Sequence, residues 1–424
     1  MQSGLIERVI EDQLHYFKAK PPGILREINI SRALKSNQVV AITGIRRCGK
    51  STLLRQIAAK YSEYYYLNFD DDRLLGFTVS DFENLMMAWK KLSKAGVIVL
   101  DEIQVVPGWE RFVRRIHDEN YKVFITGSNA DLLSGELSTH LTGRHHSIEL
   151  YPFSLYEFLK FRNFDSTIKT TDNHIRLTEL TDEYLENGGF PEYLIYQDPE
   201  YLRRVYEDII YRDLIVRFKI RDTKSFRELS RYLFTNITSV IGYNSLQRVL
   251  NIGSVWSVKN YIDYLRQSFL FTEVFKYDYS MKKQLVYDKK IFSIDNGLRN
   301  AVSLRFSNDS GKLLENAVFI HLKRTDNEIY YYKGKRECDF LISYKNKIAS
   351  AIQVTDLITN SNRDREMEGL REAMQKFDLK EGTIITRDTE DKYDVNEGVI
   401  RIVPAYKWLQ YEQSDIVNNE KARR

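Results

Sequence analysis

Residues 44–51 read Gly44-Ile45-Arg46-Arg47-Cys48-Gly49-Lys50-Ser51, and they match the phosphate-binding pattern G-x-x-x-x-G-K-[ST] at every required position. The apolar run 39–42 before this loop predicts a strand, and residues 52–57 after it predict a helix. A strand-to-helix turn points backbone N–H groups and the positive end of a helix dipole toward an anion. The alternative is a chance match in an ordinary βα turn. In this context the pattern predicts binding of a nucleoside triphosphate.

The residue types in this loop suit a triphosphate with a metal ion. Gly44 and Gly49 allow a tight turn without a Cβ clash. We expect Lys50 to reach the β- and γ-phosphates and Ser51 to ligate Mg²⁺. The predicted cofactors are therefore ATP and Mg²⁺, and the predicted nucleotide-binding residues are Gly44, Ile45, Arg46, Arg47, Cys48, Gly49, Lys50, Ser51 and Thr52.

A second apolar run, residues 96–100, ends in the acidic pair Asp101-Glu102. A continuous apolar run is typical of a buried parallel strand, and α/β sheets bind their ligands at the carboxyl ends of such strands. We expect Asp101 to hold the Mg²⁺ shell and Glu102 to polarise the attacking water, because consecutive side chains at a strand end point in different directions. By itself the pair could be a solvated acidic turn. Together with the phosphate loop it predicts hydrolysis as well as binding.

Further catalytic candidates follow the next predicted strand, residues 122–126. Ser128 and Asn129 could hydrogen-bond the γ-phosphate or the lytic water, or they could cap a helix that starts near residue 131. Arg144 could stabilise charge in the transition state, within the subunit or across to a neighbour, in which case the active form is an oligomer such as a ring. The competing interpretation of Arg144 is a surface salt bridge.

Composition limits the class of protein. The chain has 424 residues, a formal net charge of +4 and two cysteines, so we expect two or three domains without a disulfide framework. No apolar stretch approaches the roughly twenty residues of a membrane span, and the first residues show no signal-peptide pattern. We therefore expect a cytoplasmic protein with no membrane partner.

Beyond these two sites, the chain resembles a family of prokaryotic AAA+-type ATPases whose C-terminal half is known only as a domain of unknown function. The resemblance covers nearly the whole chain and rests on the order and spacing of short motifs: 44–51, 100–102, 126–128, 143–144, Tyr151-Pro152-Phe153-Ser154 with Glu157-Phe158, Gly188-Gly189-Phe190-Pro191-Glu192, Asp295-Asn296-Gly297-Leu298-Arg299 and Leu314-Glu315-Asn316.

The resemblance implies an α/β fold with four parts and a polar tail. These are a P-loop NTPase core of AAA+ type over residues 1–155, a helical lid or linker over 156–222, a winged-helix domain over 223–300, a restriction-endonuclease-like α/β domain over 301–412, and the tail 413–424. In the lid, residues 201–221 hold six Lys/Arg against three acids, which fits a solvated lid or a face for nucleic acid.

The residues between 246 and 267 have helix-turn-helix spacing, with a turn at 251–253. The predicted core is Leu246, Leu250, Val255, Val258, Ile262 and Leu265. Residues 276–279 and 282–287 look like a hairpin wing with basic and aromatic tips. Winged helices contact DNA or serve as protein-binding modules. The predicted DNA-binding residues are Ser257, Lys259, Asn260, Lys282 and Lys283.

In the last domain, Glu315 on a predicted helix and Asp339 on a predicted strand look like the PD-(D/E)xK nuclease superfamily. That chemistry needs two carboxylates for Mg²⁺ and a Lys that helps produce hydroxide. Here Gln353 stands where a Glu is expected and Thr355 where the Lys belongs, although Lys333 or Lys335 could reach the site. We therefore expect a nuclease-like scaffold that does not cleave, with Glu315, Asp339 and Gln353 as its remnant site.

Together these patterns predict a Mg²⁺-dependent ATPase that binds DNA and couples hydrolysis to DNA remodelling or translocation, with branched DNA as one candidate substrate. Two alternatives stay open. One is a nucleotide-dependent signalling switch acting on a protein or promoter, and the other is a nuclease gated by ATP. A motor predicts rapid DNA-stimulated hydrolysis, whereas a switch predicts slow turnover and tight nucleotide retention.

Overall fold

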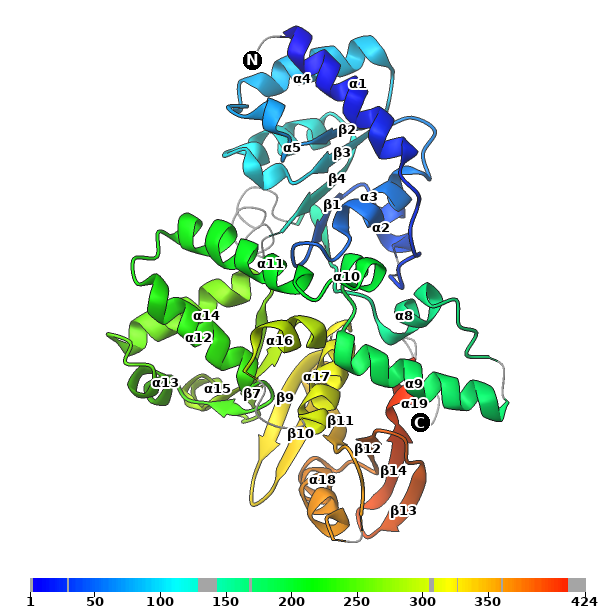
Figure 1. Cartoon of the computed structure of the whole chain (residues 1–424), viewed down its shortest axis with the longest axis vertical. Coiled ribbons are helices and arrows are strands. Elements are labelled where there is room, and N and C mark those ends of the chain that lie inside the picture. Colours follow the sequence, from blue (N-terminus) through cyan, green and yellow to red (C-terminus); the bar gives the residue numbers. More distant parts are fainter. Residues whose placement is uncertain are drawn as a thin grey trace. The chain divides into compact units, whose positions relative to one another are not determined.

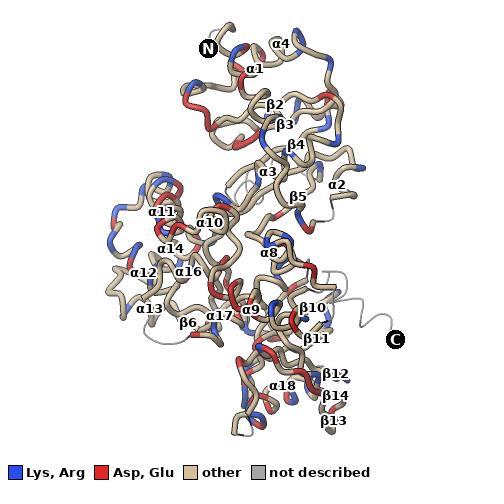
Figure 2. The backbone as a smooth tube through the Cα atoms, turned by 45° about the vertical axis from the view of Figure 1, so that its right-hand side comes forward, with Lys and Arg blue, Asp and Glu red and all other residues tan. Residues whose placement is uncertain are grey.

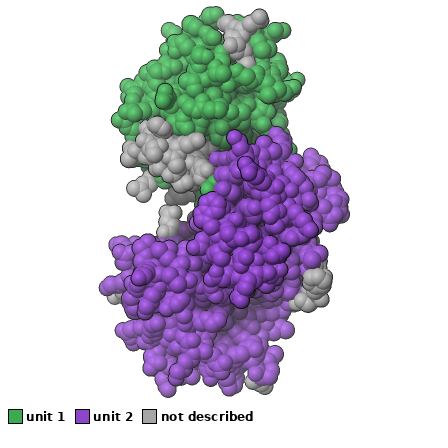
Figure 3. Space-filling model, turned by 90° about the vertical axis from the view of Figure 1, so that its left-hand side faces the viewer, with its two compact units in different colours: residues 1–151, 267–269 green, residues 152–266, 270–424 purple. Residues whose placement is uncertain are grey.

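The structure, a computed structural model, describes residues 3–28, 30–128, 143–167, 170–304, 309–325, 327–359 and 361–410. Asn129, the residues from 131 to 142 and the tail 413–424 lie outside this part of the chain, and so do the predictions that concern them. The chain divides into two compact units, coloured separately in Figure 3. Unit 1 comprises residues 1–151 with 267–269, and unit 2 comprises residues 152–266 with 270–424.

Unit 1 is built on a five-stranded sheet in which every neighbouring pair is parallel (Figure 1). Parallel strands need crossover connections, and the chain supplies helices between them. The strands lie in the order β2 (Tyr65–Asn68), β3 (Val97–Asp101), β4 (Lys122–Gly127), β1 (Val39–Thr43) and β5 (His145–Glu149). The sheet expected around the phosphate loop is therefore present, with β1 and the acidic strand β3 separated by β4.

The helices of unit 1 are α1 (Ser3–Ala19), α2 (Ser31–Lys35), α3 (Lys50–Ala58), α4 (Asp81–Leu92) and α5 (Trp109–Asp118), with 3-10 turns at Asp72–Leu74 and Ile103–Val105. One hydrophobic cluster joins α1, α4 and α5 to the sheet, with Phe82 stacked on Phe112 at 3.9 Å between ring centroids. Leu100 belongs to that cluster. Because side chains alternate along a strand, the neighbouring Asp101 faces the other side of the sheet, where α3 packs on β1, β3 and β4.

Unit 2 begins with helices. They are α8 (Leu155–Phe161), α9 (Thr171–Asn187), α10 (Pro191–Tyr196), α11 (Tyr201–Asp208) continued by the π-helix Ile209–Val216, and α12 (Thr223–Thr235). Basic and acidic residues alternate along α11 and the helices beside it in Figure 2. Arg203 pairs with Glu200 at 3.1 Å, and Arg204 pairs with Asp198. These ion pairs favour a solvated helix here over a face for nucleic acid.

A nine-stranded sheet runs through the rest of unit 2, in the order β13-β14-β12-β11-β10-β9-β7-β8-β6. Its strands are β6 (Val240–Ile241), β7 (Phe271–Lys276), β8 (Lys289–Ser293), β9 (Glu328–Lys333), β10 (Glu337–Tyr344), β11 (Lys347–Val354), β12 (Glu381–Thr386), β13 (Asp391–Val395) and β14 (Gly398–Pro404). The helices are α13 (Tyr243–Val249), α14 (Val255–Gln267), α15 (Met281–Val286), α16 (Asn296–Val302), α17 (Ser310–Lys323), α18 (Arg363–Phe377) and α19 (Ala405–Trp408).

The sheet is continuous because β7 pairs with β9 in parallel, with Phe275 opposite Tyr330 and Lys276 opposite Tyr331. It links the strands around α13 and α14 to the strands of the C-terminal part. The sequence analysis expected two separate domains here and did not anticipate a shared sheet. Short strands far apart along the chain carry no local signal for such a pairing.

The expected hairpin wing is wrong in one respect. Residues 282–287, interpreted as its second strand, lie mainly in the helix α15, and the strand that pairs with β7 is β8. The core predicted for α13 and α14 is mostly buried. Leu246, Val258, Ile262 and Leu265 are buried, whereas Leu250 and Val255 are only half-buried.

The short motifs of unit 2 that carried the family resemblance meet one another in space. Asp295 caps α16 by accepting from the Leu298 N–H at 2.9 Å, and it also accepts from the Gly189 N–H at 2.7 Å. A Cβ on Gly189 would lie 2.3 Å from the carbonyl oxygen of Phe153, so the backbones approach too closely for any other residue. The Asn316 amide donates to Asn296 at 2.9 Å. These motifs therefore have a structural role as a buried polar junction.

Candidate nucleotide site

The phosphate loop lies between β1 and α3 in unit 1, as its sequence predicts. Gly49 precedes α3 with φ 103°, and Gly44 has φ 142°. A Cβ on Gly44 would lie 2.1 Å from the carbonyl oxygen of Leu150, so only glycine fits there. Helix α3 begins at Lys50, two residues before the predicted start, so its first turn directs free N–H groups at the loop.

Lys50 is buried and spans the loop. Its ammonium donates to the carbonyl oxygens of Gly44 at 3.0 Å and Ile45 at 3.1 Å. From outside the loop, Arg26 donates to the carbonyl oxygens of Cys48 at 2.9 Å and Tyr151 at 2.6 Å. The sequence analysis missed Arg26, since its distance along the chain from the loop leaves no pattern. Lys50 and Arg26 thus both stabilise the loop by donating to its carbonyl groups.

Asp101 stands at the end of β3, 1% exposed, with hydroxyl groups around it. The hydroxyl of Thr126 donates to its carboxylate, and the nearby Ser51 hydroxyl stabilises the charged form of the carboxylate. Burial raises the pKa of Asp101, the charge of Glu102 adds to this effect, and the two hydroxyls and Lys50 oppose it. The structure therefore brings together the two predicted metal ligands, Ser51 and Asp101.

Glu102 follows Asp101 in a left-handed backbone conformation, with φ 52°. The Glu102 side chain is half-buried, and the Glu102 N–H donates to the Thr126 hydroxyl at 3.0 Å. The Gln104 amide donates to the Glu102 carboxylate. Asp101 and Glu102 thus have different surroundings, as expected if one is a Mg²⁺ ligand and the other polarises the water.

Thr126 is the residue that the sequence analysis overlooked at this site. Its hydroxyl donates to Asp101 and accepts from Glu102, so it links both acids, and it is fully buried on β4. Ser128, the predicted sensor, lies half-buried just past the end of β4. Its role stays a prediction.

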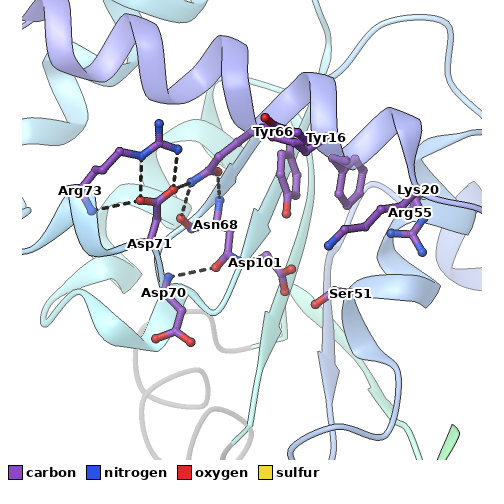
Figure 4. Close-up of a pocket in the computed structure, with 12 residues that line it drawn as sticks. Tyr16, Lys20, Ser51, Arg55, Tyr66, Asn68, Asp70, Asp71, Arg73 and Asp101 are labelled. Carbon is purple, nitrogen blue, oxygen red and sulfur yellow. Dashed lines mark hydrogen bonds and ion pairs between the residues drawn. The ribbon is translucent and has the colours of Figure 1, made fainter. Parts of the chain in front are cut away.

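A cavity of about 310 Å³ opens beside Ser51 and Asp101 (Figure 4). Lys20 and Arg55 lie on one side of it, and the ion pair of Arg73 with Asp71 lies on the other. The remaining lining residues are Gln13, Tyr16, Phe17, Tyr66, Asn68 and Asp70. The N-terminal helix α1 thus forms one wall of a space that reaches the predicted metal ligands.

The donors fit a nucleoside triphosphate with Mg²⁺. A Ser hydroxyl and a carboxylate are the hard oxygen ligands that Mg²⁺ uses beside phosphate oxygens. Gly44 and Gly49 hold the open loop, and the Lys50 ammonium lies within it. Each of these residues was predicted from the sequence.

Arg144 forms an ion pair within this chain, and its role in the transition state stays a prediction. It precedes β5, is exposed, and its guanidinium pairs with Asp118 of α5 at 2.7 Å. That contact is the surface salt bridge that the sequence analysis named as the competing interpretation.

The predicted remnant nuclease site lies in unit 2, where Glu315, Asp339 and Gln353 come together. The Asp339 N–H donates to the Gln353 side-chain oxygen at 3.3 Å. The Lys290 ammonium lies 3.0 Å from Glu315 and 2.8 Å from Asp339. Of the two lysines considered for this site, Lys333 lies 3.7 Å from Glu337 with its side chain about half exposed, whereas the buried Lys290 contacts Glu315 and Asp339 directly.

The predicted DNA-binding residues lie on α14 and α15. Lys259, Lys282 and Lys283 are exposed, and Ser257 and Asn260 are half-buried. The Ser254 hydroxyl caps α14 by accepting from the Ser257 N–H at 3.0 Å. Trp256 on the first turn of α14 is 73% exposed, which the sequence analysis did not note.

Comparison with known proteins first gives the class. Residues 36–159 match the family described as AAA domain, and residues 178–310 match a domain of unknown function, DUF8612. The first match spans the phosphate loop, Asp101-Glu102 and all five strands from β1 to β5. The chain therefore contains a P-loop core of the AAA type.

Two uncharacterized relatives then give the particular family. One, from Methanocaldococcus jannaschii, is 34% identical over 95% of this chain and 95% of its own length. The other, from Haemophilus influenzae, is 30% identical over 80% of this chain and 88% of its own length. The chain belongs to the family of these proteins.

Among solved structures, the Holliday junction branch migration motor RuvB of Thermotoga maritima is 17% identical over 60% of this chain and 92% of its own, with a TM-score of 0.29. A TM-score of this size does not establish a shared arrangement. In the described part of the chain, no helix combines the length and the apolar character that crossing a bilayer requires.

Proposed function

We propose that this protein is a Mg²⁺-dependent ATPase that binds DNA and couples hydrolysis to remodelling of DNA or translocation along it. The observation that carries the ATPase part is the contact of Ser51 and Thr126 with the buried Asp101 at the phosphate loop. The match of residues 36–159 to an AAA domain supports it.

In this proposal the residues of unit 1 divide the work. The loop N–H groups and Lys50 bind the β- and γ-phosphates, and Ser51 and Asp101 hold Mg²⁺, which supplies charge neutralisation for the phosphoryl group when it is bound. Glu102 accepts a proton from the attacking water. Thr126 positions both acids, since its hydroxyl contacts the carboxylate of one and the N–H of the other.

The Gln104 amide gives Glu102 a defined orientation. Gln104 lies two residues after Glu102, in the 3-10 turn Ile103–Val105, and donates to the Glu102 carboxylate. A base held by one hydrogen bond keeps its other oxygen for the water. Gln104 is therefore a positioning residue in this proposal.

For DNA, the proposal rests on the part of unit 2 between α12 and β8. The main elements follow one another as α12, β6, α13, α14, β7 and β8, and the strands pair in the order β7-β8-β6, which is typical of a winged helix. The exposed residues Lys259, Lys282 and Lys283 suit contact with phosphates. The exposed Trp256 suits stacking on an unpaired base. Branched DNA, which offers both duplex and unpaired bases, is the substrate that we favour.

The test is the Mg²⁺-dependent rate of ATP hydrolysis, measured without DNA and with single-stranded, duplex and four-way-junction DNA. Lys50→Ala and Glu102→Gln serve as hydrolysis controls, and Trp256→Ala separates DNA contact from catalysis. We expect one DNA form to stimulate hydrolysis, and Trp256→Ala to lose the stimulation while keeping the basal rate. A slow rate that is indifferent to every DNA would reject the DNA motor and favour a nucleotide-dependent switch.

A further inference from the structure

Lys290 of β8 is a buried lysine surrounded by acids. Its ammonium lies 3.0 Å from Glu315 of α17, 2.7 Å from Glu337 and 2.8 Å from Asp339, both of β10. The side chain of Lys290 is 3% exposed, and those of Glu315 and Asp339 are 14% and 9% exposed. A charge this deeply buried persists only when it is paired.

The acids around Lys290 hold its ammonium group. It donates to Glu315 at 3.0 Å and to Asp339 at 2.8 Å, and a Glu337 carboxylate oxygen lies 2.7 Å from it. In a nuclease of this pattern the lysine instead faces the water that it helps to activate. Lys290 therefore does not replace the catalytic lysine that is missing at Thr355.

The ammonium instead takes the place of a cation between the carboxylates. Glu315 and Asp339 are two of the residues that the nuclease pattern assigns to Mg²⁺, and both contact Lys290. The second oxygen of Asp339 accepts from the Val354 N–H at 2.9 Å. Gln353 is also engaged, because its amide donates to Glu366 at 3.1 Å.

The sheet holds Lys290 in this position. Strand β8 pairs with β6 on one side and β7 on the other, and β7 pairs with β9. The next two residues of β8, Ile291 and Phe292, are fully buried, and Phe292 stacks on Phe319 of α17 at 4.1 Å. These contacts fix the backbone of β8, and with it the point from which the Lys290 side chain reaches the acids.

We propose that Lys290 is the built-in cation of this carboxylate site, so that the native protein binds no divalent metal there. Removing the ammonium should convert Glu315, Glu337 and Asp339 into a site for a divalent cation with oxygen ligands. The N···O distances around Lys290 are 2.7–3.0 Å. Ca²⁺–oxygen bonds are roughly 2.3–2.6 Å long and Mg²⁺–oxygen bonds roughly 2.0–2.1 Å. The carboxylates therefore need to move less to bind Ca²⁺ than to bind Mg²⁺.

The experiment titrates the full chain with Ca²⁺ by isothermal calorimetry, in the absence of nucleotide. The proteins are the native chain, Lys290→Ala, and Lys290→Ala combined with Asp339→Asn. Weak binding at Ser51 and Asp101 is common to all three and is subtracted. We expect one additional Ca²⁺ per chain in Lys290→Ala, and none in the native chain or the double variant. This outcome does not depend on ATP hydrolysis or on DNA binding.

Two results would overturn the proposal. One is a native chain whose melting temperature rises with Ca²⁺ in a way that Asp339→Asn abolishes, since the site would then accept metal with Lys290 in place. The other is a folded Lys290→Ala protein that binds no additional Ca²⁺. If Lys290→Ala does not fold, Lys290→Ser, which keeps all three acids, takes its place. We expect it to bind one additional Ca²⁺ per chain, and a folded form without such binding would also reject the proposal.

Discussion

The two units each place a buried lysine near carboxylates at a sheet, but with opposite consequences. In unit 1 the Lys50 ammonium donates to loop carbonyl groups, and Asp101 is contacted by the hydroxyls of Ser51 and Thr126. In unit 2 the Lys290 ammonium sits directly among Glu315, Glu337 and Asp339. In our proposals, acids and a lysine close together do not by themselves define a metal site. The direction in which the lysine is held then decides whether an external cation is needed.

The largest effect should come from the acid assigned to the water. We expect Glu102→Gln to lower ATP hydrolysis by about 10²- to 10⁴-fold, because a proton acceptor is lost while the loop is unchanged. Nucleotide binding, measured by fluorescence titration, should remain close to that of the native chain. Lys60→Ala, an exposed change in the same unit, serves as the control. Near-native turnover of Glu102→Gln would reject Glu102 as the residue that accepts the proton from water.

Next in size is the loss of the internal cation of unit 2. We expect Lys290→Met to lower the free energy of unfolding by about 3–5 kcal/mol, because three acids are left without their partner. Urea denaturation at neutral pH measures this change. Lys282→Met, at an exposed position, is the matched control. A loss below about 1 kcal/mol would mean that the ammonium does not hold the acids together.

Substitutions of Thr126 test whether a hydroxyl group holds the buried acid of unit 1, as the Lys290 ammonium holds the acids of unit 2. We expect Thr126→Val to cost about 1.5–3 kcal/mol of stability, because a hydrogen bond to a charged group is lost at a buried position. The Mg²⁺ concentration for half-maximal hydrolysis should rise, since Asp101 loses a positioning contact. Thr126→Ser, which keeps the hydroxyl, should retain the native Mg²⁺ dependence, and equal behaviour of the two variants would contradict this role.

The pH dependence of stability tests the burial of Glu315 in unit 2. Burial, with Asp339 adding to it, raises the pKa of Glu315 from 4.5 to about 8. The folded chain then holds more protons than the unfolded chain between these values, so the free energy of unfolding falls as pH rises through this window. The slope is at most about 1.4 kcal/mol per pH unit. Urea unfolding from pH 5 to 8 measures it, and Glu315→Gln should flatten the curve.

The smallest effect is expected at Arg144. Its exposed pair with Asp118 should contribute about 0–1 kcal/mol, and Arg144→Ala should leave hydrolysis within twofold of the native rate. Hydrolysis measured over a range of protein concentrations checks this. A loss of 10³-fold or more would instead identify an arginine that acts on the transition state across subunits.

The sequence predicted the nucleotide site well because its parts are local. The loop from Gly44 to Ser51, the strand before it and the acids Asp101 and Glu102 carry their chemistry in consecutive residues. The strand predicted around Asp339 is also present, as β10, and the helix predicted around Glu315 is present as α17.

Features made by distant segments could not be predicted. Lys290 reaches acids that lie 25, 47 and 49 positions further along the chain (315 − 290, 337 − 290 and 339 − 290), and no spacing rule connects them. Thr126 is one polar residue in an apolar strand, and only its neighbours in space reveal its part in the site. The short helix α15 was taken for a strand because its six residues are too few for helical periodicity to show.

The pairing of β7 with β9 also affects how the chain is made. Strand β7 ends at Lys276 and its partner begins at Glu328, 52 positions later (328 − 276). At roughly 5–20 residues per second, a growing chain leaves this edge of β7 without its neighbour for about 3–10 s. An uncovered edge strand is a template for pairing with other chains. A ribosome that stalls in this interval would therefore release a fragment prone to associate with its own kind, whereas a chain completed past β9 covers the edge itself.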